Sequence, residues 1–165
     1  KSDKMTLQDT ISAVEEFHKA FKIENNYKPT VALSEAEIDL RHRLMGEEND
    51  EYMEAAKNGD IVEVADALGD MLYILCGTIL KHGVQHKIEE VFQEIQRSNM
   101  SKLDAKGQPI YREDGKVMKS DQYFRPNIAA ILAQCKSHWF SVVEFRIISD
   151  SGKCKRCCNV KHNAY

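Results

Sequence analysis

The sequence predicts an all-α fold that resembles a four-helix bundle, with a short hairpin or ordered loop after it and an irregular C-terminal tail. Apolar residues recur at helical spacing in four successive segments. Glycine and proline are scarce, at eight and three of 165 residues, which favours long helices over many turns. Acidic residues also cluster on the second and third of these segments. These three observations decide the fold class.

Two helices are expected before residue 60. Thr6 can cap a first helix whose apolar positions recur at helical spacing until about residues 24–26. Ser34 and Glu37 form a capping-box pattern that opens a second helix. This helix continues to about Lys57 and stops at the Asn-Gly pair of residues 58–59.

A third and a fourth helix are expected after that stop. Asp60 can cap the third helix, which runs to Gly83, and the fourth runs from near His86 to about Met100. Only a couple of residues separate the second helix from the third, so the two must be antiparallel neighbours. The third helix is apolar nearly all round, a pattern typical of a buried helix.

The character of the chain changes after residue 102. Turn residues 113–115 lie between two apolar pairs and predict a small hairpin or ordered loop. Asn127 can cap a short helix over residues 128–133. Beyond residue 134 the pattern loses coherence, although residues 139–145 resemble a strand. We therefore expect one domain over residues 6–132 and an extension of unknown role over residues 133–165.

Several acidic residues of the second and third helices lie on the same helical faces as apolar residues. At about 100° per residue, Glu63, Asp66 and Asp70 share one face, and Glu48 and Glu51 lie in line with apolar positions. We expect these carboxylates to point inward, where their mutual repulsion would need a compensating cation. The bland alternative is a solvated acidic face, which is the usual meaning of such a run. The other charged residues of the second helix lie on a different face, which argues against this alternative.

A divalent metal is the economical compensation. Glu48 with Glu51, and Glu63 with Asp66, are pairs spaced three residues apart, so two antiparallel helices could close four carboxylates around one ion. Hard oxygen ligands favour Mg²⁺, or alternatively Mn²⁺, over zinc.

Composition limits the partners. A formal charge of -3 gives no electrostatic footprint for nucleic acid or an anionic membrane. No apolar run of about 18 residues and no signal-peptide pattern is present in the sequence. We therefore expect a cytoplasmic protein that binds neither nucleic acid nor membrane.

The acidic motifs carry a family resemblance. The pattern EExxE, a gap and then ExxD is matched by Glu47, Glu48 and Glu51 and by Glu63 and Asp66. The segments EVADALGDMLYILCGTILKHG and FQEIQRSNMSKLDAKGQPIYREDGKVMKSDQYFRP add to the match in order and spacing. Over about residues 6 to 132 the chain resembles the MazG-like superfamily of all-α nucleoside triphosphate pyrophosphohydrolases.

The resemblance implies an activity and an assembly. It implies Mg²⁺-dependent hydrolysis of a (deoxy)nucleoside triphosphate between its α and β phosphates, giving a monophosphate and pyrophosphate, as house-cleaning of the nucleotide pool. It also implies a homodimer or homotetramer. Two alternatives remain: a non-enzymatic helical interaction module with a structural cation site, and a pyrophosphohydrolase of another nucleotide such as phosphoribosyl-ATP.

The resemblance also implies roles for individual residues. The implied metal ligands are Glu48, Glu51, Glu63 and Asp66. Glu47 and Asp70, with Glu48, are the implied catalytic carboxylates, which orient water or bind a second cation. Some family members place the last ligand in an ELGD context, which would make it Asp70, although residue 67 is Ala here. The implied substrate-binding residues are Asn99 and Lys102 for sugar or phosphate, with Lys119 and Tyr123 closing over the phosphates.

Other chemistry-bearing residues are expected to have plainer roles. His18, His42 and His82 are expected to be solvated or core residues, Arg97 a surface charge and Tyr73 a core aromatic. Cys76 is expected to be a small core residue. In the tail, the Cys and His residues at positions 135, 138, 154 and 157 have a spacing that would suit a zinc ribbon, but we favour a loosely packed extension.

Overall fold

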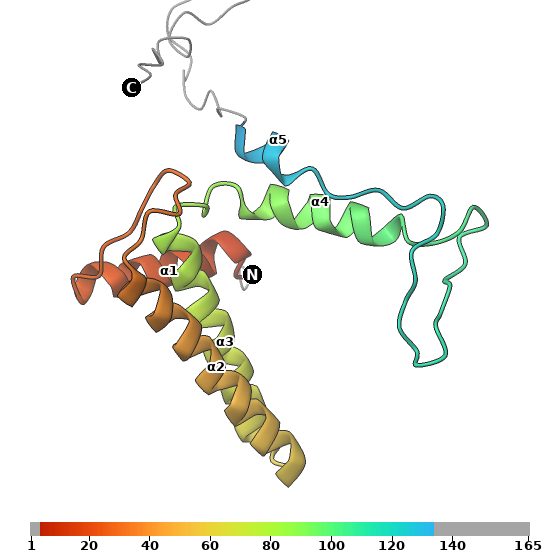
Figure 1. Ribbon diagram of the computed structural model, residues 1–165. Coiled ribbons are helices and arrows are strands. Elements are labelled where there is room, and N and C mark those ends of the chain that lie inside the picture. Colours follow the sequence, from red (N-terminus) through yellow and green to blue (C-terminus); the bar gives the residue numbers. More distant parts are fainter. Residues whose placement is uncertain (1–3, 134–165) are drawn as a thin grey trace, which may run out of the picture. The chain divides into compact units, whose positions relative to one another are not determined.

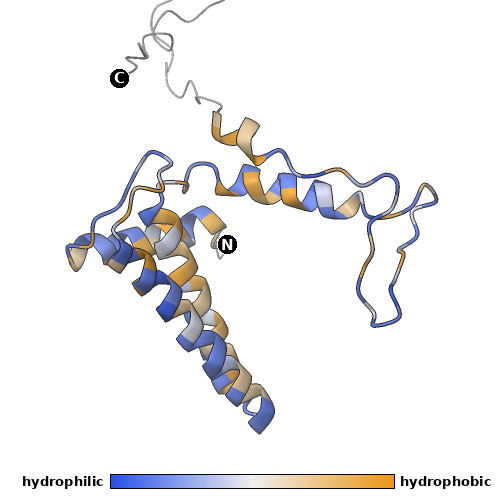
Figure 2. Cartoon of the chain, viewed as in Figure 1, coloured by the Kyte–Doolittle hydropathy of each residue, from blue (hydrophilic) through white to orange (hydrophobic). Residues whose placement is uncertain are grey.

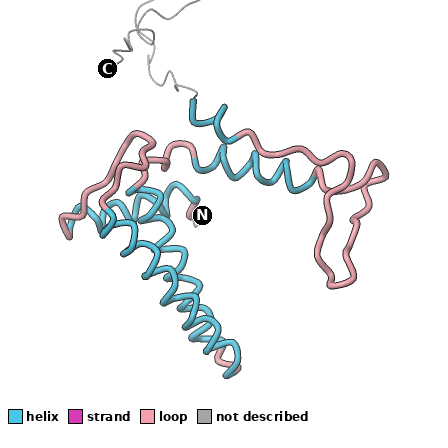
Figure 3. The backbone as a smooth tube through the Cα atoms, viewed as in Figure 1, coloured by secondary structure: helices cyan, strands magenta, loops and turns pink. Residues whose placement is uncertain are grey.

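The structure is a computed structural model that describes residues 4–133. Figure 3 shows helices joined by loops, and the described residues contain no strand. The helices, labelled in Figure 1, are α1 (Leu7–Ala20), α2 (Glu35–Asn58), α3 (Ile61–Lys81), α4 (Ile88–Met100) and α5 (Ile128–Ala133). The prediction of an all-α fold is confirmed.

The residues predicted to cap the N-termini of the first three helices are found at those positions. Thr6 and Ser34 each form a complete capping box, with Asp9 and Glu37 respectively. The Asp60 carboxylate accepts hydrogen bonds from two backbone amides in the first turn of α3, at 3.0 and 3.2 Å. Local polar chemistry therefore fixes where these helices begin.

Helix α1 ends earlier than predicted, at Ala20 rather than near residues 24–26. Lys22 takes a left-handed backbone conformation, with φ 58°, and the Ile23 amide donates to the His18 carbonyl at 2.8 Å. This arrangement satisfies the last carbonyl groups of the helix and turns the chain away. No glycine marks the position, so the sequence offers no signal for it.

The core lies where α1 packs on α3. Ile11 and Val14 of α1 pack with Cys76, Ile79 and Leu80 of α3, and all five are buried. The burial of Cys76 confirms its predicted role as a small core residue. Helices α2 and α3 run side by side and antiparallel, as predicted from their short connection (Figure 1).

A network of polar contacts ties the loop after α1 to the end of α3. The buried Lys81 ammonium forms an ion pair with Glu37 at 2.6 Å and donates to the Glu24 carbonyl at 3.0 Å. The amides of Asn26 and Thr30 donate to carbonyls of residues 80 and 82. These contacts hold the start of α2 and the end of α3 in fixed positions.

The prediction that α3 is buried all round is wrong for the single chain. Figure 2 shows hydrophobic residues along α3, yet Leu68, Leu72 and Leu75 are 50%, 44% and 47% exposed. Helix α1 packs against α3 near its C-terminal end and α2 covers its acidic face, so these leucines have no cover from the described part of the chain.

The segment after α4 folds as predicted. Tyr111 and Val117 form an isolated antiparallel bridge, which confirms the small hairpin. Asn127 accepts a hydrogen bond from the Ala130 amide at 3.1 Å and caps α5. The strand expected at residues 139–145 and the Cys and His residues of the tail lie outside the described residues. None of the described helices is long and apolar enough to cross a membrane.

Candidate functional site

The acidic faces of α2 and α3 meet along the helix pair. Near one end, Arg41 lies against Gly77. Two turns along each helix, Glu48 lies within electrostatic reach of Asp70. Two turns further, Ala55 and Glu63 line the same pocket. The two helices therefore stay in one register, which places the predicted acidic residues on facing sides.

Glu48 is the centre of the acidic cluster. Its side chain is half-buried, and its pKa is raised, first by desolvation and then by the negative charges of Glu51, Asp70, Asp66 and Glu47. Repulsion of this kind makes a carboxylate hold its proton more tightly. A cation placed among these residues would relieve the repulsion, so the field of the cluster favours cation binding.

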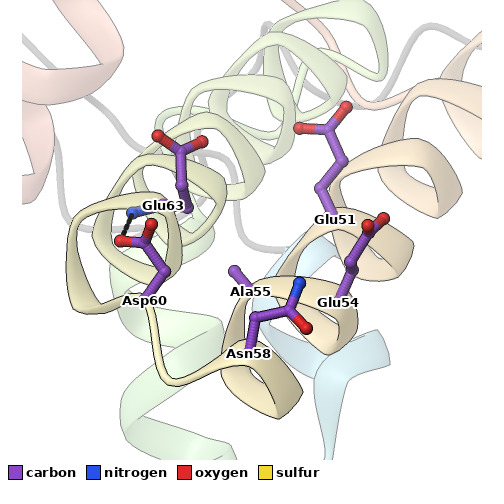
Figure 4. Close-up of a pocket in the computed structure, with 6 residues that line it drawn as sticks. All are labelled: Glu51, Glu54, Ala55, Asn58, Asp60 and Glu63. Carbon is purple, nitrogen blue, oxygen red and sulfur yellow. Dashed lines mark hydrogen bonds between the residues drawn. The ribbon is translucent and has the colours of Figure 1, made fainter.

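A pocket of about 270 Å³ lies at the hairpin end of the cluster. Figure 4 shows Glu51 on α2 and Glu63 on α3 projecting on the same side of the pair. Asp60 also lines the pocket, but its carboxylate is already engaged with the first turn of α3. The other carboxylates that line the pocket are the two predicted metal-binding glutamates and Glu54, and Asn58 adds an amide oxygen.

The prediction that these carboxylates point inward, away from water, is wrong for the single chain. Glu51, Glu63, Asp66 and Asp70 are exposed, and only Glu48 is half-buried. Among residues 4–133, no group of three or more acidic, histidine or cysteine side chains is placed to hold one ion. The donor chemistry fits Mg²⁺, because every acid in the cluster offers hard carboxylate oxygens. Their side chains would have to rotate toward a shared ion.

The two residues predicted to handle water differ in their surroundings. Glu47 is engaged with Arg43, one turn earlier on α2, at 3.1 Å. Asp70 forms no ion pair within the described chain and acts on the pKa of Glu48 more strongly than Asp66 does. The geometry therefore brings Asp70 into the cluster together with Asp66, and both positions for the last ligand stay open.

The four predicted substrate-binding residues form two contacting pairs. The Lys102 ammonium donates to the Asn99 side-chain oxygen at 2.8 Å, at the C-terminal end of α4. The Lys119 ammonium lies 4.4 Å from the centre of the Tyr123 ring, a cation–π contact. Both lysines keep donor capacity for phosphate oxygens.

A serine network holds these pairs in one segment. The Ser120 hydroxyl lies within hydrogen-bonding distance of the carbonyls of Ser101 and Leu103, at 3.2 and 2.7 Å. Buried Ser98 donates to the Phe124 carbonyl at 2.8 Å. Within the described residues, no hydrogen bond or ion pair joins the four substrate-binding residues to the acidic cluster.

The side chains of His18, Arg97 and Tyr73 differ in burial. His18 is buried and hydrogen-bonds Asn25 at 2.6 Å, which agrees with a core role. Arg97 is exposed and contacts Glu94 through two hydrogen bonds, as expected of a surface charge. Tyr73 is 40% exposed and meets Phe17 edge-on, so the prediction of a core aromatic is wrong. Phe17 of α1 covers only part of the Tyr73 ring.

Arg41 is not among the site residues predicted from the sequence. This arginine is half-buried on α2, in the line of Glu48, and lines a second pocket with Met45 and Met71. Desolvation lowers the pKa of Arg41. One signal was available: Arg41 and Glu48 are seven residues apart and therefore share a helical face.

The sequence model of one family, phosphoribosyl-ATP pyrophosphohydrolase, matches residues 14–99, which is more than half of the chain. The chain belongs to the phosphoribosyl-ATP pyrophosphohydrolase family. It is thus a member of the MazG-like superfamily, as the acidic motifs indicated. The matched region contains the whole acidic cluster and ends at Asn99, before Lys102, Lys119 and Tyr123. No curated protein matches the chain.

Proposed function

We propose that this protein is a Mg²⁺-dependent pyrophosphohydrolase that acts on phosphoribosyl-ATP. The observation that carries the proposal is the gathering of carboxylates around Glu48 inside the region matched by the family. The family match favours this substrate over the general nucleoside triphosphates expected from the sequence. House-cleaning of the nucleotide pool is therefore the second candidate, supported by the motif resemblance.

The reaction adds water to the α phosphorus. The new bond joins the water oxygen to that phosphorus, and the bond to the oxygen bridging the α and β phosphates breaks. Pyrophosphate leaves, and phosphoribosyl-AMP remains. The proton lost by the water passes to a carboxylate of the cluster, either Asp70 or Glu47. Asp70 is the better placed, because Glu47 already contacts Arg43.

Four carboxylates are proposed to hold the metal, namely Glu48, Glu51, Glu63 and Asp66. Bound Mg²⁺ would neutralise phosphate charge and position the attacking water. The half-buried position of Glu48, with its raised pKa, makes it the residue that gains most from cation binding. Asp70 is the alternative for the last ligand or for a second ion.

Cationic and polar groups from the segment after α4 are proposed to bind the rest of the substrate. Asn99 and Lys102 would contact sugar or phosphate, and Lys119 with Tyr123 would close over the phosphates. The fixed contacts within each pair reduce the side-chain entropy lost on binding.

A homodimer or homotetramer is proposed to be the working assembly. The exposed leucines of α3 form an apolar stripe, since Leu68, Leu72 and Leu75 recur on one helical face. Contiguous apolar surface of this kind is typical of a protein interface. A second copy covering the stripe would bury these leucines and leave the acidic cluster, on the opposite side of α3, open to substrate.

Pyrophosphate release from a panel of substrates tests the proposal. Phosphoribosyl-ATP, the common nucleoside triphosphates and their deoxy forms are supplied with and without Mg²⁺. We expect phosphoribosyl-ATP to be hydrolysed with the highest kcat/KM, and only with the metal. Faster turnover of a simple triphosphate would establish the second candidate. A folded protein that hydrolyses none of them would support the non-enzymatic interaction module.

A further inference from the structure

Arg41 is a half-buried cation that has no partner in the described part of the chain. It makes no hydrogen bond and no ion pair with any described residue, and burial alone lowers its pKa. Removing a guanidinium from water without an acceptor costs free energy. An acceptor from outside the described chain would recover that cost, so this position favours an anion.

Local packing holds the Arg41 side chain in place. A Cβ atom at Gly77 would lie 2.9 Å from Arg41 Nη1 and 3.1 Å from His18 Nε2. The guanidinium therefore lies against the α3 backbone in space that only glycine leaves open. The His18 ring is fixed by its hydrogen bond to Asn25. Arg41 is thus a positioned donor rather than a solvated surface charge.

The line of residues from the acids to Arg41 matches the layout of a long substrate. Arg41 lies two turns from Glu48, a rise of about 10 Å along α2. On α3, Asp70 lies opposite Glu48 and Gly77 lies opposite Arg41. Tyr73 lies between these two positions, one turn after Asp70, and is partly exposed. The order is therefore carboxylates for a metal and a triphosphate, then an aromatic ring, then a cation.

We propose that Arg41 binds the single phosphate of the phosphoribosyl group, the ribose phosphate that phosphoribosyl-ATP carries on its base and that ATP lacks. This inference rests on the proposed function, because phosphoribosyl-ATP carries such a phosphate at the end remote from its triphosphate and simple nucleoside triphosphates do not. The guanidinium fork suits two phosphate oxygens at once. Arg41 then selects phosphoribosyl-ATP over ATP.

An acidic residue from a second copy of the chain is a less suitable partner for Arg41 than a substrate phosphate. The apolar stripe of α3, at Leu68, Leu72 and Leu75, lies on the side of that helix opposite Asp70. Arg41 contacts the other side, at Gly77. A second copy docked on the stripe would therefore not bring an acid to Arg41 by that contact.

The test compares Arg41→Gln with a matched control, Lys57→Gln. Lys57 is an exposed cation of α2 on the side of the helix away from Glu48. We expect Arg41→Gln to raise KM for phosphoribosyl-ATP about 10- to 100-fold with little change in kcat, the effect of losing charge-assisted hydrogen bonds. The inhibition constant of ATP against this reaction should stay unchanged, and Arg41→Lys should restore part of the loss. Lys57→Gln should behave as wild type.

Two results would overturn the assignment. One is an unchanged KM for phosphoribosyl-ATP in Arg41→Gln. The other is an equal loss for phosphoribosyl-ATP and ATP, which would mean a structural role. If the wild-type protein does not hydrolyse phosphoribosyl-ATP, the proposed function fails and calorimetry with ribose 5-phosphate decides the subsite separately. Binding to wild type that is lost in Arg41→Gln would uphold the subsite, and absence of binding to wild type would end it.

Discussion

The close approach of Gly83 to the loop after α1 gives a prediction of defined size. Gly83 has φ 67°, and a Cβ atom there would lie 2.7 Å from the Lys28 carbonyl carbon and closer still to its oxygen. The left-handed conformation costs a non-glycine residue about 1–2 kcal/mol. Overpacking against backbone adds about 1–3 kcal/mol. We expect Gly83→Ala to lower the free energy of unfolding by about 2–5 kcal/mol, a large part of the usual total.

Two other glycines serve as controls for the separate contributions. Gly59 has φ 72° but open space around it, so Gly59→Ala should show only the conformational cost of about 1–2 kcal/mol. Gly46 lies inside α2, also in open space, so Gly46→Ala should raise the free energy of unfolding by up to about 1 kcal/mol. The assay is urea unfolding followed by circular dichroism, at one protein concentration throughout. Equal losses in Gly83→Ala and Gly59→Ala would refute the reasoning, because the close approach would then contribute nothing.

Three further predictions concern charge and assembly. Glu48→Gln should abolish Mg²⁺-dependent turnover while the thermal midpoint stays equal or rises, since a repelled carboxylate is removed; wild-type turnover would contradict its role as ligand. Lys81, and then Ser34, lower the pKa of Glu37 from 4.5 to about 2, so this carboxylate stabilises the fold fully above pH 4.5 and loses that effect as pH falls toward 2. Glu37→Gln should therefore be less stable than wild type at pH 7 and converge with it near pH 2 in acid-unfolding curves; a constant difference would count against the ion pair with Lys81. Leu72→Lys should convert the oligomer to monomer in light scattering, because its side chain is exposed in the single chain; a wild-type protein that is already monomeric would remove the proposed assembly.

Much of the fold follows from local chemistry in the sequence. The caps at Thr6, Ser34 and Asp60 act within three residues of each helix start, so their side-chain types are enough to predict them. The short connection after Asn58 fixed α2 and α3 as antiparallel neighbours. The end of α1 was not predictable in the same way, because Lys22 takes a left-handed conformation that lysine rarely adopts.

The mutual orientation of the acids on α2 and α3 could be predicted, but their surroundings could not. Helical spacing placed Glu48, Asp66 and Asp70 on facing sides, which the structure confirms. Burial could not be read from spacing, because an apolar face shows that cover is needed and not whether the same chain supplies it. For the same reason α3 was expected to be buried, whereas Leu72 and its neighbours are exposed. Arg41 could not be predicted in this way, because its lack of a partner among the described residues depends on tertiary packing and not on helical spacing.

The most direct measurement is hydrolysis of phosphoribosyl-ATP in water enriched in heavy oxygen, with mass analysis of both products. The account predicts that the label enters phosphoribosyl-AMP and not pyrophosphate, that the reaction requires Mg²⁺, and that Glu48→Gln abolishes it. Label in the pyrophosphate would contradict attack at the α phosphorus. No labelled product from a folded, metal-supplied protein would contradict the enzymatic role itself.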